Sequence, residues 1–288
     1  MEEKKTAGLD TGNGQRGKRI SPEEVRKLQI ELLLFLKNVC EKHGLRYYLT
    51  GGTLLGAIRH KGFIPWDDDV DIRMPREDFE KLIKIGAHQS KDARRRIVSW
   101  KTGETKYPFI KIIDTHTLLK EQYMDSSFMT SVWIDIFALD GMPEDDRAIA
   151  VRCGVLEVYR TLFNAAISEI GKGTTRFRKY VKMVIVPFCR HLNTKRICDR
   201  MNLIASKYPV DTSPYVGQFL WGYGACEKMP RTYLDAVPVE FEGHQFPAPG
   251  CWDEYLTSVY GDYMQLPPED KRVNHGFDAW WKEFTDAH

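Results

Sequence analysis

The sequence has no excess of charge of either sign. Its 288 residues contain 42 Lys and Arg against 40 Asp and Glu, a formal net charge of +2. A dedicated nucleic-acid-binding protein usually carries a clear basic excess, so we expect no nucleic acid as a partner. The six cysteines are scattered and form no Cys-x-x-Cys motif, which disfavours a disulfide framework and a zinc site. A reduced, cytoplasmic setting is therefore expected.

Long apolar runs are missing as well. No stretch reaches the roughly 18 consecutive apolar residues of a membrane-spanning helix. Residues 1–19 mix both charges with Gly, Thr and Asn, so we expect a disordered tail without a signal peptide. Hydrophobic residues at 42% and charged residues at 28% are ordinary values for a folded globular protein.

The spacing of apolar residues and turn residues predicts a mixture of helices and strands. Ser21-Pro22-Glu23-Glu24 is a capping box that begins a helix, which Gly44 ends. A second helix is expected at Glu77–Ile85. Strands are expected at Leu45–Leu49, Trp66–Arg73 and Ser131–Ala138, and a pair of strands at Tyr107–Ile113 and Leu118–Gln122. Strands that alternate with helices predict an α/β or α+β core.

The second half of the chain has a more helical pattern. Helices are expected between Glu144 and Asn202, followed by a hairpin at Val239–Phe246 and an aromatic-rich helix from Trp252. Within Gly171–Arg200, nine Lys and Arg stand against one acidic residue. This stretch is either the solvated face of a helix or a basic surface for an anionic membrane or a polyanionic acceptor.

The most informative segment is Trp66-Asp-Asp-Asp-Val-Asp-Ile72. Side chains alternate faces along a strand, so Asp67, Asp69 and Asp71 are expected on one face. Neighbouring carboxylates repel each other, and a strand tolerates this only at an exposed edge or where a cation neutralises them. The alternative is an acidic surface loop. Carboxylates without His or Cys suit Mg²⁺ or Mn²⁺, so a metal site is the favoured interpretation.

Asp135 lies in the otherwise apolar segment Val132–Phe137. A lone carboxylate there is costly to bury without a partner. It points to solvent from an edge strand, accepts a backbone hydrogen bond, or supplies a third carboxylate to the same metal site, and we favour the last interpretation.

Gly51-Gly52-Thr53 connects the strand expected at Leu45–Leu49 to a helical segment expected at Leu54–His60. Glycines allow a close approach of backbone to ligand, and a helix N-terminus favours phosphate. Such turns also carry glycine for conformational reasons alone. Arg59 and Lys111 are candidates to contact phosphate oxygens, and His275 is a weaker one; each is also compatible with an ordinary surface position.

These segments carry a resemblance to a known family. The stretch from Tyr48 to Ile72 resembles the signature of the LicD-type phosphotransferases, which belong to the nucleotidyltransferase fold superfamily and are related to the fukutin-type ribitol-phosphate transferases. Asp135–Gly141 resembles the strand that carries the third carboxylate of the family, and Tyr260–Pro268 resembles its C-terminal segment.

The resemblance implies an α+β fold with a nucleotidyltransferase-like mixed sheet flanked by helices and a helical C-terminal half. Together with the helical pattern and the basic stretch of the middle region, it divides the chain into a catalytic core at 20–143, a helical basic segment at 144–215 and a C-terminal part of the same domain at 216–288. It also implies that Gly51 and Gly52 open a phosphate-binding turn, that Asp69 and Asp71 are a metal-binding pair, and that Asp135 is the third carboxylate.

The implied reaction is the transfer of a substituted phosphate, typically phosphocholine, from a CDP-linked alcohol to a hydroxyl of a cell-surface glycan, with release of CMP. Peripheral contact with the inner face of an anionic membrane would bring such an enzyme to a lipid-linked acceptor. The rival interpretations are a nucleotidyltransferase that moves NMP from an NTP, a non-catalytic nucleotide- or glycan-binding protein, and a two-metal nuclease, which the balanced charge disfavours.

Overall fold

The first helix, α1 (Pro22–His43), begins as the capping box predicts. The Ser21 hydroxyl accepts from the Glu24 backbone N–H at 3.2 Å, and the Glu24 carboxylate accepts from the Ser21 N–H at 2.8 Å. Gly44 ends the helix in the left-handed conformation, with φ at +63°. The computed structural model describes residues 17–121, 130–167, 191–222, 224, 227–272 and 276–283.

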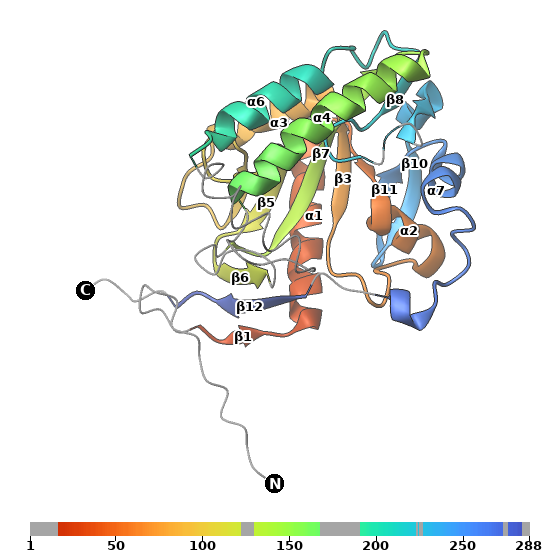
Figure 1. The fold of residues 1–288 in the computed structure, drawn as a ribbon. Coiled ribbons are helices and arrows are strands. Elements are labelled where there is room, and N and C mark those ends of the chain that lie inside the picture. Colours follow the sequence, from red (N-terminus) through yellow and green to blue (C-terminus); the bar gives the residue numbers. More distant parts are fainter. Residues whose placement is uncertain are drawn as a thin grey trace.

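A mixed β-sheet forms the centre of the fold (Figure 1), as the α+β prediction expects. Its main strands run in the spatial order β2 (Tyr48–Leu49), β3 (Asp71–Pro75), β7 (Trp133–Met142), β5 (Ile110–Asp114) and β4 (Arg95–Val98). β3 and β7 pair in parallel, and the other neighbours in this order are antiparallel. The short strands β8 (Tyr215–Gly217) and β9 (Met229–Pro230) extend the sheet from the end of β7.

One face of the sheet is apolar. Ile72, Ile110, Ile112, Ile134 and Ile136 alternate inward along β3, β5 and β7 and are fully buried. Helices α1 and α3 (Arg76–Ala87) cover this face. The burial of β-branched side chains between a sheet and two helices is the main stabilisation of such a layer.

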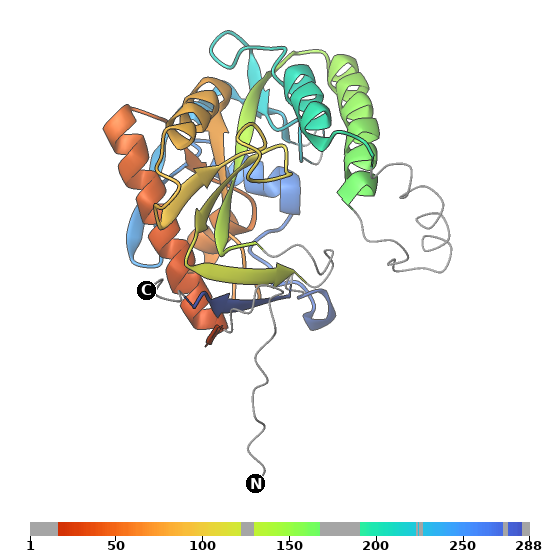
Figure 2. The ribbon, with the colours of Figure 1, turned by 90° about the vertical axis from the view of Figure 1, so that its left-hand side faces the viewer.

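The two helices of the middle of the chain, α4 (Asp146–Ile167) and α6 (Thr194–Ala205), pack against each other. Figure 2 shows α4 on the side of the sheet opposite to α1. Among the described helices, none is long and apolar enough to cross a membrane. The greater part of the predicted basic stretch, up to Arg190, lies outside the described residues.

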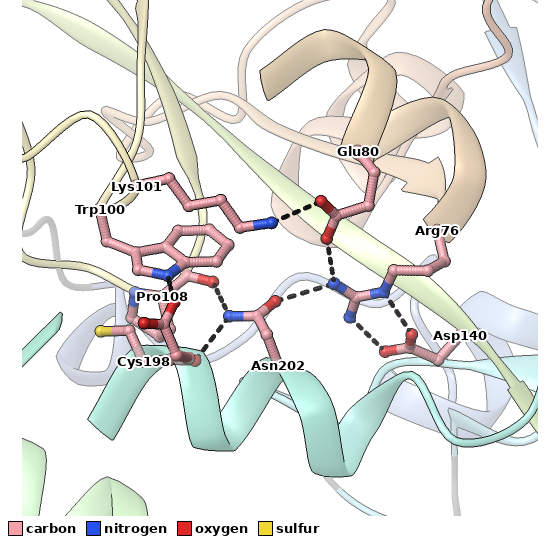
Figure 3. Close-up of polar contacts among 9 residues, drawn as sticks. Arg76, Glu80, Trp100, Lys101, Pro108, Asp140, Cys198 and Asn202 are labelled. Atoms are coloured by element: carbon pink, nitrogen blue, oxygen red, sulfur yellow. Dashed lines mark hydrogen bonds and ion pairs between the residues drawn. The ribbon is translucent and has the colours of Figure 1, made fainter. Parts of the chain in front are cut away.

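A buried polar cluster ties α6 to the end of β7 (Figure 3). The Arg76 guanidinium donates to both carboxylate oxygens of Asp140, at 2.7 and 2.9 Å, and to Asn202 Oδ1 of α6 at 2.8 Å. The Asn202 amide donates in turn to the backbone carbonyls of Pro108 and Cys198. Removing one partner of a buried ion pair is strongly destabilising, so this cluster fixes how the helices lie on the sheet.

The C-terminal part wraps around this core. A hairpin of β10 (Val237–Phe241) and β11 (His244–Ala248) turns at Gly243, and α7 (Trp252–Tyr260) follows. Both were predicted and are confirmed. A second, three-stranded sheet joins β1 (Arg19–Ile20), β12 (Phe277–Trp281) and β6 (Thr117–Glu121). Arg19, the last residue of the expected tail, therefore belongs to a strand.

Two strand predictions are wrong in detail. The segments around β5 and β6 were predicted to pair with each other, but β6 pairs with β12. Hydrogen bonds in the connection between β5 and β6 explain why the two strands do not pair. The Thr117 hydroxyl donates to the Asp114 carbonyl and accepts from the Val132 N–H. β7 also continues past Ala138 to Met142, and its buried Asp140 carboxylate accepts from Arg76.

Candidate active site

Three charged side chains form a row across the second face of the sheet. Asp71 of β3 lies in register with Asp135 of β7, and Lys111 of β5 lies in register with Asp135 on the other side. Residues in register on adjacent strands project from the same face. The Lys111 ammonium donates to Asp135 Oδ1 at 2.7 Å, and only 15% of the Asp135 side chain is exposed. Asp135 therefore does not point freely to solvent, whereas its assignment as the third metal-binding carboxylate stays a prediction.

Burial raises the pKa of Asp135 above the usual value of an aspartate. The Lys111 ammonium opposes this increase, and the charge of the Asp69 carboxylate adds to it. Asp69 therefore acts electrostatically on Asp135. It does not share a strand with Asp71, however: β3 begins only at Asp71, and the predicted strand from Trp66 is wrong for its first residues.

The acidic segment before β3 is shaped by α1. Arg26 donates to the backbone carbonyls of Pro65 and Asp67, at 2.8 and 2.9 Å, and Gln29 donates to the Asp68 carbonyl at 2.8 Å. These carbonyls accept hydrogen bonds from side chains, which explains why this segment is a loop and not a strand. On its other side, Asp68 Oδ2 accepts from the Gly276 N–H at 3.3 Å, so Asp68 contacts the C-terminal segment.

The predicted glycine turn lies directly against these carboxylates. Helix α2 (Gly51–His60) begins at Gly51, whose φ of +55° favours glycine. A Cβ at Gly51 would lie 3.3 Å from Asp71 Oδ2, and one at Gly52 would lie 2.4 Å from Asp67 Oδ2. The N-terminus of α2 therefore faces two carboxylates, with which its dipole interacts favourably.

Thr53 fastens this turn to the sheet. Its hydroxyl accepts from the Asp71 N–H at 2.8 Å, and the Thr50 N–H donates to the Asp71 carbonyl at 3.2 Å. The side chain of Thr53 is buried. In the structure Thr53 thus holds Asp71 in place beside Gly51.

Arg59 lies at the other end of α2, about 12 Å along the helix axis from Gly51. Its Nη1 donates to the Tyr263 carbonyl at 2.6 Å, and its Nε donates to His60 Nε2 at 2.9 Å. Burial lowers the pKa of Arg59. In the structure this side chain holds the segment after α7. His275, the weakest of the predicted phosphate contacts, lies outside the described residues.

Two tyrosines of α7 also lie against the turn. Tyr260 begins the segment that resembles the C-terminal part of the family, but no sequence pattern assigned either tyrosine to the site. The Gly51 N–H donates to the Tyr255 hydroxyl at 3.3 Å, and that hydroxyl also lies 3.0 Å from Thr50 Oγ1. The Tyr260 hydroxyl lies 3.8 Å from the position of a Cβ at Gly51. Their contribution depends on a helix two hundred residues away in the sequence, about which local motifs carry no information.

A buried ion pair between Arg73 and Glu227 lies next to Tyr255. Arg73, two residues after Asp71 on the same face, donates to Glu227 Oε1 and Gln218 Oε1, both at 2.8 Å. Its guanidinium also lies 5.0 Å from the ring centroid of Tyr255. Burial opposes the charge of Arg73, but the Glu227 carboxylate holds its pKa well above the usual value.

An aromatic box surrounds the Lys111 ammonium. Its Nζ lies 4.0 Å from the ring centroid of Trp133, 4.8 Å from that of Tyr107 and 5.4 Å from that of Phe109. Lys111 was predicted to contact phosphate or to lie in solvent, but it is only 5% exposed, so the solvated position is wrong. Each ring is within the range of a cation–π interaction.

The chemistry of these carboxylates suits a hard divalent cation, because all their ligand atoms are oxygen. Among the residues that the structure describes, however, no three His, Cys, Asp or Glu side chains converge as metal ligands do. Instead, one oxygen of the Asp135 carboxylate accepts a hydrogen bond from the Lys111 ammonium. Carboxylate oxygens are ligands of the type that Mg²⁺ or Mn²⁺ prefers. To hold an ion, the carboxylates of Asp69, Asp71 and Asp135 would have to move closer together.

Known proteins resemble this chain over most of its length and over the site. A family model described as LicD/FKTN/FKRP, nucleotidyltransferase domain, matches residues 44–140, which include every predicted site residue except His275. The ribitol 5-phosphate transferase FKRP of Homo sapiens is 50% identical over 48 residues, 17% of this chain and 10% of that protein. The lipopolysaccharide cholinephosphotransferase LicD of Haemophilus influenzae is 32% identical over 267 residues, which cover 90% of this chain and 97% of that protein.

The match to the Haemophilus protein extends far beyond a shared motif, because it leaves only a tenth of this chain unaligned. The resemblance that the sequence motifs indicated is confirmed: the chain belongs to the LicD family of transferases.

Proposed function

We propose that this chain transfers phosphocholine from CDP-choline to a hydroxyl of a cell-surface glycan and releases CMP. The observation that carries the proposal is the close approach of the glycine turn of α2 to Asp71, which lies in register with Asp135. The similarity to a cholinephosphotransferase along nearly the whole chain supports the choice of phosphocholine.

In this reaction the acceptor oxygen attacks the phosphorus that carries choline. The bond from that phosphorus to the bridging oxygen breaks, CMP leaves with the bond electrons, and the acceptor hydroxyl loses its proton. Asp135 is the group we assign to take this proton. The raised pKa of its buried carboxylate favours that role, because a base works best when its pKa approaches the working pH.

The charges around the glycine turn support a bound cation in this reaction. A diphosphate at the α2 N-terminus would adjoin the carboxylates of Asp67 and Asp71 and be repelled by them. We propose that Asp69, Asp71 and Asp135 hold Mg²⁺ or Mn²⁺. Such an ion would neutralise the diphosphate and stabilise the leaving phosphate.

For the acceptor, we propose a lipid-linked glycan such as the lipopolysaccharide in the name of the Haemophilus relative. This would place the working enzyme at the inner face of an anionic membrane. In support, α6 exposes Lys195, Arg196 and Arg200. Leu203 of α6 and Val151 of α4, 63% and 69% exposed, line one groove beside them. Cations next to exposed apolar side chains favour anionic lipid surfaces.

Co-sedimentation tests the membrane contact. We expect the full chain to sediment with vesicles that contain phosphatidylglycerol and not with pure phosphatidylcholine vesicles. The double variant Arg196→Glu, Arg200→Glu should sediment less. Equal sedimentation of the variant and the wild type would remove the electrostatic basis of this contact.

The reaction itself is tested with nucleotides. Full-length protein is incubated with Mg²⁺, a lipopolysaccharide that lacks phosphocholine, and either CDP-choline or CTP, and the products are separated by chromatography. CMP from CDP-choline is the expected result. Pyrophosphate from CTP without CMP would favour a nucleotidyltransferase, and binding without either product would favour a non-catalytic protein.

Parallel incubations with CDP-ethanolamine, CDP-glycerol and CDP-ribitol identify the donor. We expect CDP-choline to be turned over fastest. A faster reaction with CDP-glycerol or CDP-ribitol, whose head groups are uncharged, would support the same class of reaction with a different transferred group.

A further inference from the structure

The Lys111 ammonium occupies an unusual environment. Lysine is the side chain whose compact charge is most strongly hydrated, yet Lys111 is 5% exposed. Its ammonium is surrounded by an Asp135 carboxylate oxygen at 2.7 Å and by the faces of three rings, which replace the water that would otherwise hydrate it. The chain therefore contains a preformed cation site beside the carboxylate row.

We propose that the aromatic box of Tyr107, Phe109 and Trp133 is the subsite for the quaternary ammonium of the donor, and that Lys111 fills it until the donor arrives. This inference rests on the proposed transfer of phosphocholine and adds where the head group binds. It assigns the three rings to substrate selection and gives Lys111 two alternative positions.

The chemistry of the box suits a quaternary ammonium better than a primary one. A trimethylated nitrogen has no N–H to satisfy and gives up its water more easily, while ring faces attract any cation. Lys111 needs the hydrogen bond to Asp135, whereas a trimethylammonium group needs only the rings and a nearby negative charge. Exchange of one cation for the other keeps the local charge unchanged.

The position of the box also fits the donor. Trp133 precedes Asp135 by two residues on the same face of β7, so their Cα atoms lie about 7 Å apart. A two-carbon linker separates the ammonium of choline from its phosphate ester oxygen. A donor whose phosphate lies beside Asp135 can therefore bring its ammonium to Trp133.

The box is partly exposed. Tyr107 and Trp133 are half-buried and the Asp135 side chain is 15% exposed, whereas Phe109 is 4% exposed. The four methylene groups of Lys111 allow its ammonium to leave the rings and turn toward a donor phosphate oxygen. In that position Lys111 would make the phosphate contact that its sequence position predicted.

Two variants separate this exchange from a purely structural role. Lys111→Met empties the box of its own cation while keeping the length of the side chain. We expect it to bind tetramethylammonium at least about 3-fold more tightly than the wild type, as measured by NMR titration of the ligand methyl signal. Its CMP release should nevertheless fall, because the lysine no longer reaches the phosphate. A structural role would weaken both properties.

Trp133→Leu keeps Lys111 and removes the nearest ring. We expect its preference for CDP-choline over CDP-glycerol, the ratio of kcat/KM values, to fall about 3- to 30-fold. Trp281→Leu is the matched control, because Trp281 also contacts a cation, Arg94 at 5.8 Å, but lies in the second sheet. It should leave the ratio unchanged. Circular dichroism checks that each variant is folded.

The proposal is overturned if Lys111→Met binds tetramethylammonium less tightly than the wild type. It is equally overturned if Trp133→Leu slows both donors by the same factor. Failure of the proposed reaction looks different: the wild type would then bind tetramethylammonium in the box but release no CMP from CDP-choline, which supports the subsite and contradicts the transfer.

Discussion

Asp71 and Asp135 lie side by side on the only parallel pair among the described strands, and Asp71 also touches the glycine turn that begins α2. β3 and β7 each bring one carboxylate to the same face, while Thr53 fixes the turn by accepting the Asp71 N–H. The site is therefore built on rigid elements and not on loops alone, which is what precise positioning of reacting groups requires.

Gly52→Ala is expected to impair activity more than stability. Its methyl group would lie 2.4 Å from Asp67 Oδ2 and displace that carboxylate, although alanine is itself a better helix residue than glycine. We expect CMP release to fall about tenfold or more, equivalent to about 1.4 kcal/mol, with little change in melting temperature. Gly154→Ala is the control: it lies in α4, a Cβ there meets nothing within 4 Å, and activity should be unchanged. Equal rates in both variants would contradict this role of Gly52.

Arg59→Met distinguishes two roles for this side chain. If Arg59 holds the segment after α7, as its bond to the Tyr263 carbonyl indicates, the variant should be cleaved faster within 261–268 by chymotrypsin or a broad-specificity protease. Loss of that bond should also lower the free energy of unfolding by about 1–3 kcal/mol. A higher KM for the donor with unchanged proteolysis would instead indicate the direct phosphate contact predicted from the sequence.

Asp140→Asn is expected to destabilise the fold without altering the chemistry. The variant leaves the buried Arg76 guanidinium without its carboxylate, which costs about 3–5 kcal/mol for a buried pair. Urea unfolding measures this loss, and Asp92→Asn, at an exposed position, should change stability by less than about 0.5 kcal/mol. A variant as stable as the wild type would show that Asp140 does not anchor α6.

Stability should fall in alkaline solution partly because of Cys198. Burial raises the pKa of its thiol to about 12, whereas a thiol in the unfolded chain ionises near 8.5. Between these values the folded state binds one more proton than the unfolded state, so its stability falls as the pH rises. Cys198→Ala should make this fall shallower by about 1.4 kcal/mol per pH unit. Urea unfolding between pH 8 and pH 10 tests it, and an unchanged slope would contradict it.

Much of the site follows from sequence alone because its parts are local. The capping box at Ser21, the glycine turn at Gly51 and the acidic run before β3 are short patterns with direct chemical consequences. The lone Asp135 in an apolar strand was informative for the same reason, because an unpaired buried carboxylate is costly.

What the sequence could not predict depends on contacts between distant residues. The acidic run was expected to begin a strand, but Arg26 and Gln29 of α1 bind its carbonyls and keep it a loop. Lys111 has the pattern of any strand lysine, and only the folded chain brings Tyr107 and Trp133 around it. Asp140 lies past the end of the predicted strand Ser131–Ala138, and only the folded chain identifies Arg76 as its partner.

The most direct test of this account is the initial rate of CMP release from CDP-choline by the wild type and by Asp71→Asn, with Asp92→Asn as the control. The account predicts that Asp71→Asn remains folded and loses CMP release by about 10³-fold or more, about 4 kcal/mol of transition-state stabilisation, while Asp92→Asn matches the wild type. An Asp71→Asn protein that releases CMP at the wild-type rate would contradict the assignment of this site.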